Sequence, residues 1–216
     1  MSVDVSSLAY ALRKSSATVG PELKHGHAQQ LIAAALGYKS LAAYQSALTA
    51  GAEPVQLDAA AHVLLDEGLV EQRAVELELP HNLEALNALI RKVIDEALPS
   101  AEVHRWESSL QEGITERLQE FVEISGPVAN AMGDANYDGI DETYMPFELS
   151  WNNFPAPGEV RVESVKGKVT LGLDLERPYA GHVVDVEASV TFERLGRNLV
   201  GPAEFEVERA SLSRDY

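Results

Sequence analysis

Apolar residues recur at two different spacings along this chain of 216 residues. Through most of the first 125 residues they repeat every three or four positions, which predicts amphipathic helices. Between residues 145 and 213 they alternate with polar residues, which predicts β-strands with one polar face. Helices followed by strands indicate an α+β fold, with long helices packed on a C-terminal antiparallel β-sheet.

The pattern divides the chain into three zones. Residues 1–50 form a small helical module, residues 51–125 an acidic helical region, and residues 126–216 a loop followed by the antiparallel sheet. The loop is expected over residues 125–158 because this stretch is rich in Gly, Pro, Asn and Asp, the residues that favour turns.

Two helices of the middle zone carry the clearest signals. Asn82 can cap one helix, and Ser100 can cap a longer one. The longer helix has an apolar row at steps of three and four, made by Val103, Trp106, Leu110, Ile114, Leu118 and Phe121. This row predicts that Trp106 lies in the core. A shorter helical pattern is carried by Ala60, Val63 and Leu64.

Two turn signals divide the C-terminal strands. Lys166 and Gly167 separate the apolar rows that begin at Val160 and Val169, and they predict a hairpin turn. Residues 195–198, Leu-Gly-Arg-Asn, predict a second turn between two further strands.

The N-terminal zone predicts two short helices joined by a tight turn at residues 37–40. Gly37 can end the first helix with a positive φ, and Ser40 can cap the second. Residues 29–48 also fit a helix-turn-helix pattern. In that alternative, a DNA-binding regulator, the contacts to DNA come from Lys39, Tyr44 and Gln45. The other interpretation is a packed structural pair of helices.

Residues 25–48 read HGHAQQLIAAALGYKSLAAYQSAL. This string resembles a short helical module of glyoxalase-superfamily-related and plasmid- or integrative-element-borne bacterial proteins. The matching positions are His25 or His27, Ala28, Leu31, Ala33 or Ala34, Gly37, Tyr38 and Ser40. The resemblance implies a bacterial accessory protein of a mobile genetic element. It implies no lyase activity, because the rest of the chain lacks the paired βαβββ units and metal ligands of a glyoxalase enzyme.

The formal net charge is −17. The middle zone has five basic and sixteen acidic residues, whereas the first 50 residues are slightly basic. A phosphate-binding surface needs clustered Lys and Arg, so the last two-thirds of the chain should repel nucleic acid. This charge either keeps the protein soluble or forms a surface for a partner with a basic patch.

We therefore expect a non-enzymatic accessory or regulatory protein that acts through protein–protein contact. Self-association as a homodimer is a further expectation, since most soluble oligomers are symmetric homodimers. Trp151 and Phe154 lie where a strand meets a Pro-rich loop, and they are candidates for a partner surface. The chain contains no Cys, begins without a signal-peptide pattern and has no apolar run long enough to span a membrane. These features favour the cytoplasm.

One acidic loop is a candidate for Ca²⁺, although we expect no other cofactor. It offers oxygen ligands at alternating positions around a tight turn at Gly139, from Asp134, Asn136, Asp138, Ile140 and Glu142. The spacing is similar to that of dockerin-type calcium loops, but Met145 stands where an EF-hand has its bidentate Glu. The alternative is a polar turn. Four histidines, His62, His81, His104 and His182, are scattered without a metal-binding spacing.

Overall fold

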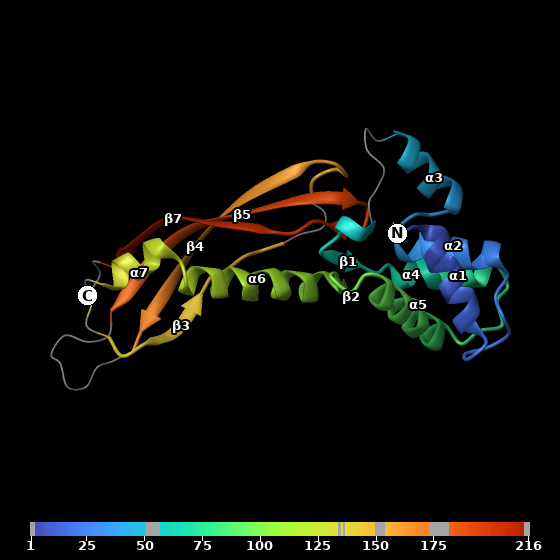
Figure 1. Ribbon diagram of the computed structural model, residues 1–216, viewed down its shortest axis with the longest axis horizontal. Coiled ribbons are helices and arrows are strands. Elements are labelled where there is room, and N and C mark those ends of the chain that lie inside the picture. The colour runs from blue at the N-terminus through green and yellow to red at the C-terminus, as the bar shows by residue number, and fades with distance from the viewer. Residues whose placement is uncertain are drawn as a thin grey trace. The chain divides into compact units, whose positions relative to one another are not determined.

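The computed structural model describes residues 3–50, 57–133, 135, 137–149, 154–172 and 182–213. Its helices and strands form an α+β fold, which confirms the predicted fold class (Figure 1). The chain divides into two compact units. Unit 1 comprises Met1–Glu107, Phe154–Glu159 and Glu193–Pro202, and unit 2 comprises Ser108–Asn153, Val160–Phe192 and Ala203–Tyr216. Among the described residues, no helix combines the length and apolarity that a membrane crossing requires.

Unit 1 is built mainly from helices. They are α1 (Val5–Ser16), α2 (His25–Ala35), α3 (Leu41–Ala50), a short 3₁₀ turn (Leu57–Ala59), α4 (Glu67–Glu76) and α5 (Leu83–Ala97). Helix α2 contacts α1, α3 and α4, and α1 also contacts α5 (Figure 1). Residues 1–50 thus share one core with the residues that follow them, and the zone boundaries at 50 and 125 do not coincide with those of the compact units.

Helix α2 lies at the centre of this core. Its residues from Leu31 to Ala35 and the adjoining Leu36 are fully buried, as is Ala28. The run of alanines explains how a helix can be enclosed on so much of its surface, because small side chains let neighbouring helices approach closely. A solvent-exposed face is left mainly near its first turn, at His25 and Gly26.

Side-chain caps fix where several helices begin. The Asp4 carboxylate accepts a hydrogen bond from the Ser7 N–H at 2.7 Å, and Asp66 caps α4 in the same way. Asn82 accepts from the Ala85 N–H at 3.0 Å, which confirms the predicted start of α5. Ser40 accepts from the Ala43 N–H at 3.0 Å, as predicted for α3.

Three strands and the end of a fourth complete unit 1. Strand β1 (His62–Leu64) pairs in parallel with β2 (Glu102–His104) and antiparallel with β6 (Leu199–Val200). The last residues of β5 (Val183–Gly196) pair with β6 across the turn predicted at residues 195–198. The prediction of that turn is confirmed.

The helices predicted around β1 and β2 were partly wrong. Val63 and Leu64 belong to β1, and Val103 belongs to β2, so the long helix begins only at Glu107. Three-residue strands are too short to show an alternating pattern, and apolar residues two or three apart fit a helix equally well. Trp106 consequently precedes the helix, and 62% of its surface is exposed rather than buried.

Unit 2 packs one long helix against a four-stranded antiparallel sheet. Its strands are β3 (Ile140–Tyr144), β4 (Val160–Leu171), the first ten residues of β5, and β7 (Glu204–Leu212), in the order β3-β4-β5-β7. Helix α6 (Glu107–Glu123) runs along one face of this sheet, and the short α7 (Gly126–Met132) contacts β7 (Figure 1). Both α7 and β3 lie within the stretch predicted as a loop.

The predicted apolar row of α6 forms its buried face. Leu110, Ile114 and Leu118 of that row stand at steps of four and are fully buried. Val122, which the predicted row does not include, is also fully buried one step of four further on, whereas Phe121 is only partly buried. The Phe121 ring lies 5.8 Å from the Phe205 ring of β7. On the sheet, the alternate residues of β5 from Val184 to Phe192 are buried, so the predicted polar and apolar faces are confirmed for this strand.

The hairpin turn predicted at Lys166 and Gly167 was wrong, because β4 continues through both residues. Gly167 instead leaves room for a neighbouring segment. A Cβ atom there would lie 2.3 Å from the Tyr144 carbonyl oxygen and 2.3 Å from the Met145 sulfur. Glycine is therefore required where the end of β3 approaches β4 closely. Close approach of another backbone is a common reason for glycine within a strand.

Candidate functional site

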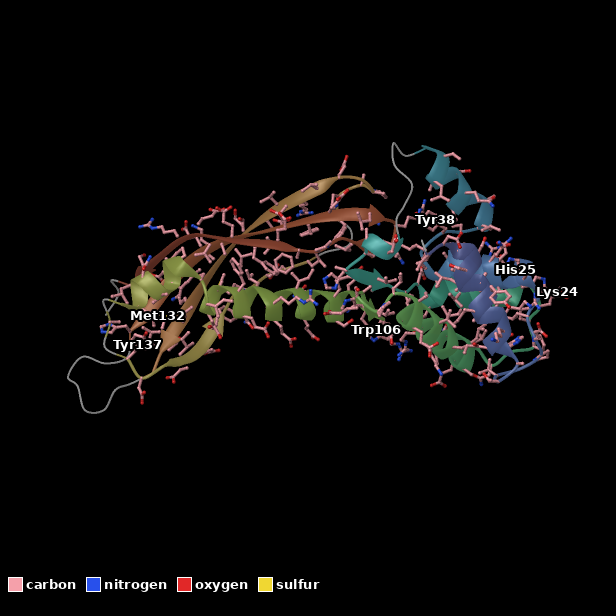
Figure 2. The ribbon with its side chains drawn as sticks, viewed as in Figure 1. Lys24, His25, Tyr38, Trp106, Met132 and Tyr137 are labelled. Carbon is pink, nitrogen blue, oxygen red and sulfur yellow. The ribbon has the colours of Figure 1, made fainter. Side chains whose placement is uncertain are left out.

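Two residues that carry the resemblance to the helical module, Gly37 and Tyr38, form the turn at the end of α2 in unit 1. Gly37 has φ +84°, and the Tyr38 and Gly37 N–H groups donate to the carbonyls of Ala33 and Ala34, which closes the end of α2. Tyr38 (labelled in Figure 2) is buried beneath the Arg197 guanidinium, 5.6 Å from its ring. This turn therefore packs on the β5–β6 turn.

Two of the three residues named for DNA contact are exposed. Lys39 and Gln45 face solvent, whereas Tyr44 is only 5% exposed and packs edge-on against Tyr38, with ring centroids 5.2 Å apart. Burial, together with the nearby Tyr38 and Asp4, raises the pKa of Tyr44 to about 12. A phenol enclosed in this way is not positioned to reach a base edge.

The predicted calcium loop is only partly described. Asp134 and Asn136 lie outside the described residues. Asp138 and Glu142 are exposed, and Ile140 begins β3. Within the described part of the chain, the loop contributes no three acidic or histidine side chains whose ligand atoms come within 4.8 Å of one another. Calcium binding at this loop stays a prediction.

Of the two aromatic residues predicted for a partner surface, the structure describes only Phe154. Trp151 lies outside the described residues. Phe154 is 9% exposed and stacks under the Arg194 guanidinium, 5.6 Å from its ring centroid. Arg194 in turn donates to the carbonyl of Pro155 at 2.9 Å. The Phe154 ring is therefore occupied in packing within unit 1.

A groove in unit 2 is the feature best suited to a partner. It runs between α6 and the segment that follows β3, and its volume is about 380 Å³. Helix α6 contributes one wall through Gln111, Glu112, Thr115, Glu116 and Gln119, and the segment contributes the other through residues 144–148. The Leu149 N–H donates to the Gln111 side chain at 3.1 Å, which fastens the segment to the helix.

Acidic side chains line the walls of the groove, and buried apolar side chains lie beneath it. Met145 and Phe147 are nearly fully buried, and the Phe147 ring packs edge-on against Phe192 of β5. Three carboxylates line the walls, from Glu112, Glu116 and Glu148, and no Lys or Arg is among the lining residues. None of the three has an ion-pair partner within 4 Å among the residues that the structure describes.

A larger hollow on the same sheet differs in its electrostatics. It has a volume of about 620 Å³ and lies over residues of all four strands, including Lys166, Lys168, Asp185, Glu187 and Arg209. Lys166 donates to Glu187 at 2.8 Å, and this hydrogen bond and charge lower the pKa of Glu187. Opposite charges therefore compensate one another in this hollow, whereas the carboxylates of the groove have no such partner in the part of the chain that the structure describes.

One group of side chains could hold a metal ion. His62, Glu102 and His104 lie together in unit 1, and among the described residues they form the one group of three whose ligand atoms lie within 4.8 Å of one another. The sequence pattern did not predict this group, because the two histidines are 42 residues apart. Knowledge that β1 and β2 pair in parallel would have been needed to find it.

Comparison of the chain with protein-family models, curated proteins and solved structures finds no match. The resemblance of residues 25–48 to the helical module of glyoxalase-related proteins therefore stays a prediction.

Proposed function

We propose that this protein is an accessory or regulatory protein that acts through protein–protein contact, without catalysis of its own. Its acidic groove, lined by Glu112, Glu116 and Glu148, binds a Lys- or Arg-bearing segment of a partner. The observation that carries this proposal is that these three carboxylates line one groove and have no ion-pair partner within 4 Å among the described residues.

The charge arrangement on α6 favours a cationic ligand. Glu112 and Glu116 stand four residues apart on one helix face, as do Glu116 and Glu120. Like charges at this spacing destabilise a helix by roughly 0.2–0.5 kcal/mol per pair. A cation placed between the Glu112 and Glu116 carboxylates offsets their repulsion and is attracted to both. Both effects make the binding free energy more favourable.

The shape of the groove favours long cationic side chains. Lys and Arg carry an aliphatic stem that packs on apolar surface while the charged head stays in contact with water or carboxylates. Tyr144 and Pro146 supply exposed apolar surface at the rim, and the carboxylates stand on the walls. A basic partner also fits better than a second copy, since two copies with a net charge of −17 repel each other.

The test is a binding titration with a fluorescently labelled oligolysine peptide, measured by anisotropy on the full chain. The groove variant combines Glu112→Gln, Glu116→Gln and Glu148→Gln. A control variant combines Glu204→Gln, Glu206→Gln and Glu208→Gln, which are exposed on β7 and change the net charge equally. Exposed ion pairs are worth roughly 0.2–1 kcal/mol each, so three of them correspond to about tenfold in Kd.

We expect the groove variant to bind about tenfold more weakly than the parent, and the control variant to bind within about twofold of it. Added salt should weaken the binding of the parent protein. Equal losses in the two variants would show that the peptide responds only to net charge, and the proposal would then be wrong.

A further inference from the structure

Two short strands bring three metal-ligating side chains to one face of the sheet in unit 1. Strands β1 and β2 are parallel, with His62 opposite Glu102 and Leu64 opposite His104. Alternate residues of a strand point to the same face, and directly paired residues share that face. The side chains of His62, Glu102 and His104 therefore project together, while Val63 points to the other face, where it is fully buried in the core.

The ligand atoms form a compact triangle. His62 Nδ1 lies 3.0 Å from His104 Nε2, and the Glu102 Oε2 lies 3.7 Å from the first and 3.8 Å from the second. Ligand atoms around a tetrahedral Zn²⁺ at 2.0–2.1 Å stand about 3.3–3.4 Å apart. The three separations in the structure lie within about 0.4 Å of this spacing, so small side-chain shifts are enough to fit the triangle to this coordination.

The burial of the three side chains also suits a metal site. The His62 side chain is fully buried and that of His104 is 8% exposed, whereas that of Glu102 is 42% exposed. Buried imidazoles are held in place, and the exposed carboxylate gives the site access to solvent. The contact between His62 Nδ1 and His104 Nε2 is a hydrogen bond between the two rings, and a bound cation replaces the proton that they share. In its neutral form each imidazole then offers one lone pair to the cation.

We propose that His62, Glu102 and His104 bind a divalent first-row transition metal ion, best represented by Zn²⁺. The ligands are His62 Nδ1, His104 Nε2 and the Glu102 carboxylate. Two imidazoles and one carboxylate suit zinc and its neighbours, whereas Ca²⁺ takes oxygen ligands. Three protein ligands leave a fourth coordination position for water or another ligand. This site is separate from the acidic groove and from the calcium loop, whose residues belong to unit 2.

The test is isothermal titration of the EDTA-treated full chain with ZnCl₂, together with its melting temperature. Glu102→Gln removes the exposed ligand with little change in size, and His104→Gln removes one imidazole. His25→Gln is the control, because His25 is an exposed histidine at the start of α2 that can bind zinc nonspecifically (Figure 2). Circular dichroism of each variant without metal establishes that it is folded.

We expect one Zn²⁺ per chain and a rise in Tm of roughly 5–10 °C at a hundredfold excess of free metal over Kd. His104→Gln should abolish this binding, Glu102→Gln should weaken it about tenfold or more, and His25→Gln should leave it unchanged. CaCl₂ should change the Tm of the parent protein and that of His104→Gln by the same amount, each relative to its own metal-free value. If the folded Glu102→Gln variant binds Zn²⁺ as tightly as the parent, or if the parent shows no saturable binding, the proposal is overturned.

Discussion

Replacement of Gly37 by alanine tests the contact between the α2–α3 turn and the β5–β6 turn. Gly37 has φ +84°, and a Cβ atom added there would lie 2.6 Å from Asn198 Oδ1 and 2.8 Å from its Cγ. A left-handed conformation costs an L-residue about 1–2 kcal/mol, and overpacking of a buried contact costs about 1–3 kcal/mol. We therefore expect Gly37→Ala to lower the free energy of unfolding by about 3 kcal/mol.

The two contributions can be separated by a double-mutant cycle. Asn198→Ala removes the atoms that a Cβ at position 37 would meet, but it leaves the positive φ in place. In that background, Gly37→Ala should cost only about 1–2 kcal/mol, so the coupling between the two sites is about 1–3 kcal/mol.

The assay is urea unfolding followed by far-ultraviolet circular dichroism, with the free energy extrapolated to water. Gly26→Ala is the control, because a Cβ atom at that position of α2 meets nothing within 4 Å. That substitution should stabilise the protein by about 0.5 kcal/mol, since alanine is the better helix former. A Gly37→Ala protein as stable as the parent would refute the assigned turn geometry and its contact with Asn198.

Two further predictions concern the core of unit 2 and the buried tyrosine of unit 1. Ile114→Ala, at a fully buried position of α6, should cost about 2–5 kcal/mol of unfolding free energy in urea. Ile124→Ala, just after α6 at a position 83% exposed, should stay within about 0.5 kcal/mol, and equal effects would contradict the burial of Ile114. Burial raises the pKa of Tyr44 from 10.0 to about 12, so the folded state favours the neutral phenol. The contribution of this preference to the free energy of unfolding is complete below pH 10 and is lost as pH rises toward 12. Alkaline unfolding titrations should show this loss, about 2–3 kcal/mol, in the parent but not in Tyr44→Phe, and identical pH profiles would contradict the burial.

The elements that could be predicted from the sequence are those whose signals are local. Asn82 caps α5 and Ser40 caps α3 because capping depends only on residues within one turn. The apolar row of α6 from Leu110 to Leu118 is long enough to define a period and a face. The alternation along β5 has the same advantage, since fourteen residues repeat the pattern several times.

The elements that could not be predicted depend on distant contacts. Strands β1 and β2 have three residues each, and they exist because they pair with each other and with β6. No local pattern brings His62 to His104, so the sequence shows the candidate metal ligands only as scattered residues. Gly167 resembles a turn residue in the sequence, which does not show that Tyr144 and Met145 approach β4 at that position.

The acidic groove could be predicted from the sequence only in part. The row of glutamates on α6 is evident in the sequence, but such a row usually marks a face turned to solvent. Residues 144–148 convert that face into the wall of a groove, and they lie in a stretch that the sequence predicted as a loop. The partner surface predicted at Trp151 and Phe154 lies only a few residues after this wall in the sequence. The Phe154 ring nevertheless packs against Arg194 within unit 1, whereas the groove belongs to unit 2.

The most direct test of the proposed function is to locate the peptide on the protein by nuclear magnetic resonance. Oligolysine would be added to the ¹⁵N-labelled full chain, and the backbone amide shifts would be followed. The proposal predicts that the largest changes fall on residues 111–119 and 144–148, the two walls of the groove. Shifts spread evenly over the acidic surface, or concentrated at residues 204–208 of β7, would contradict it.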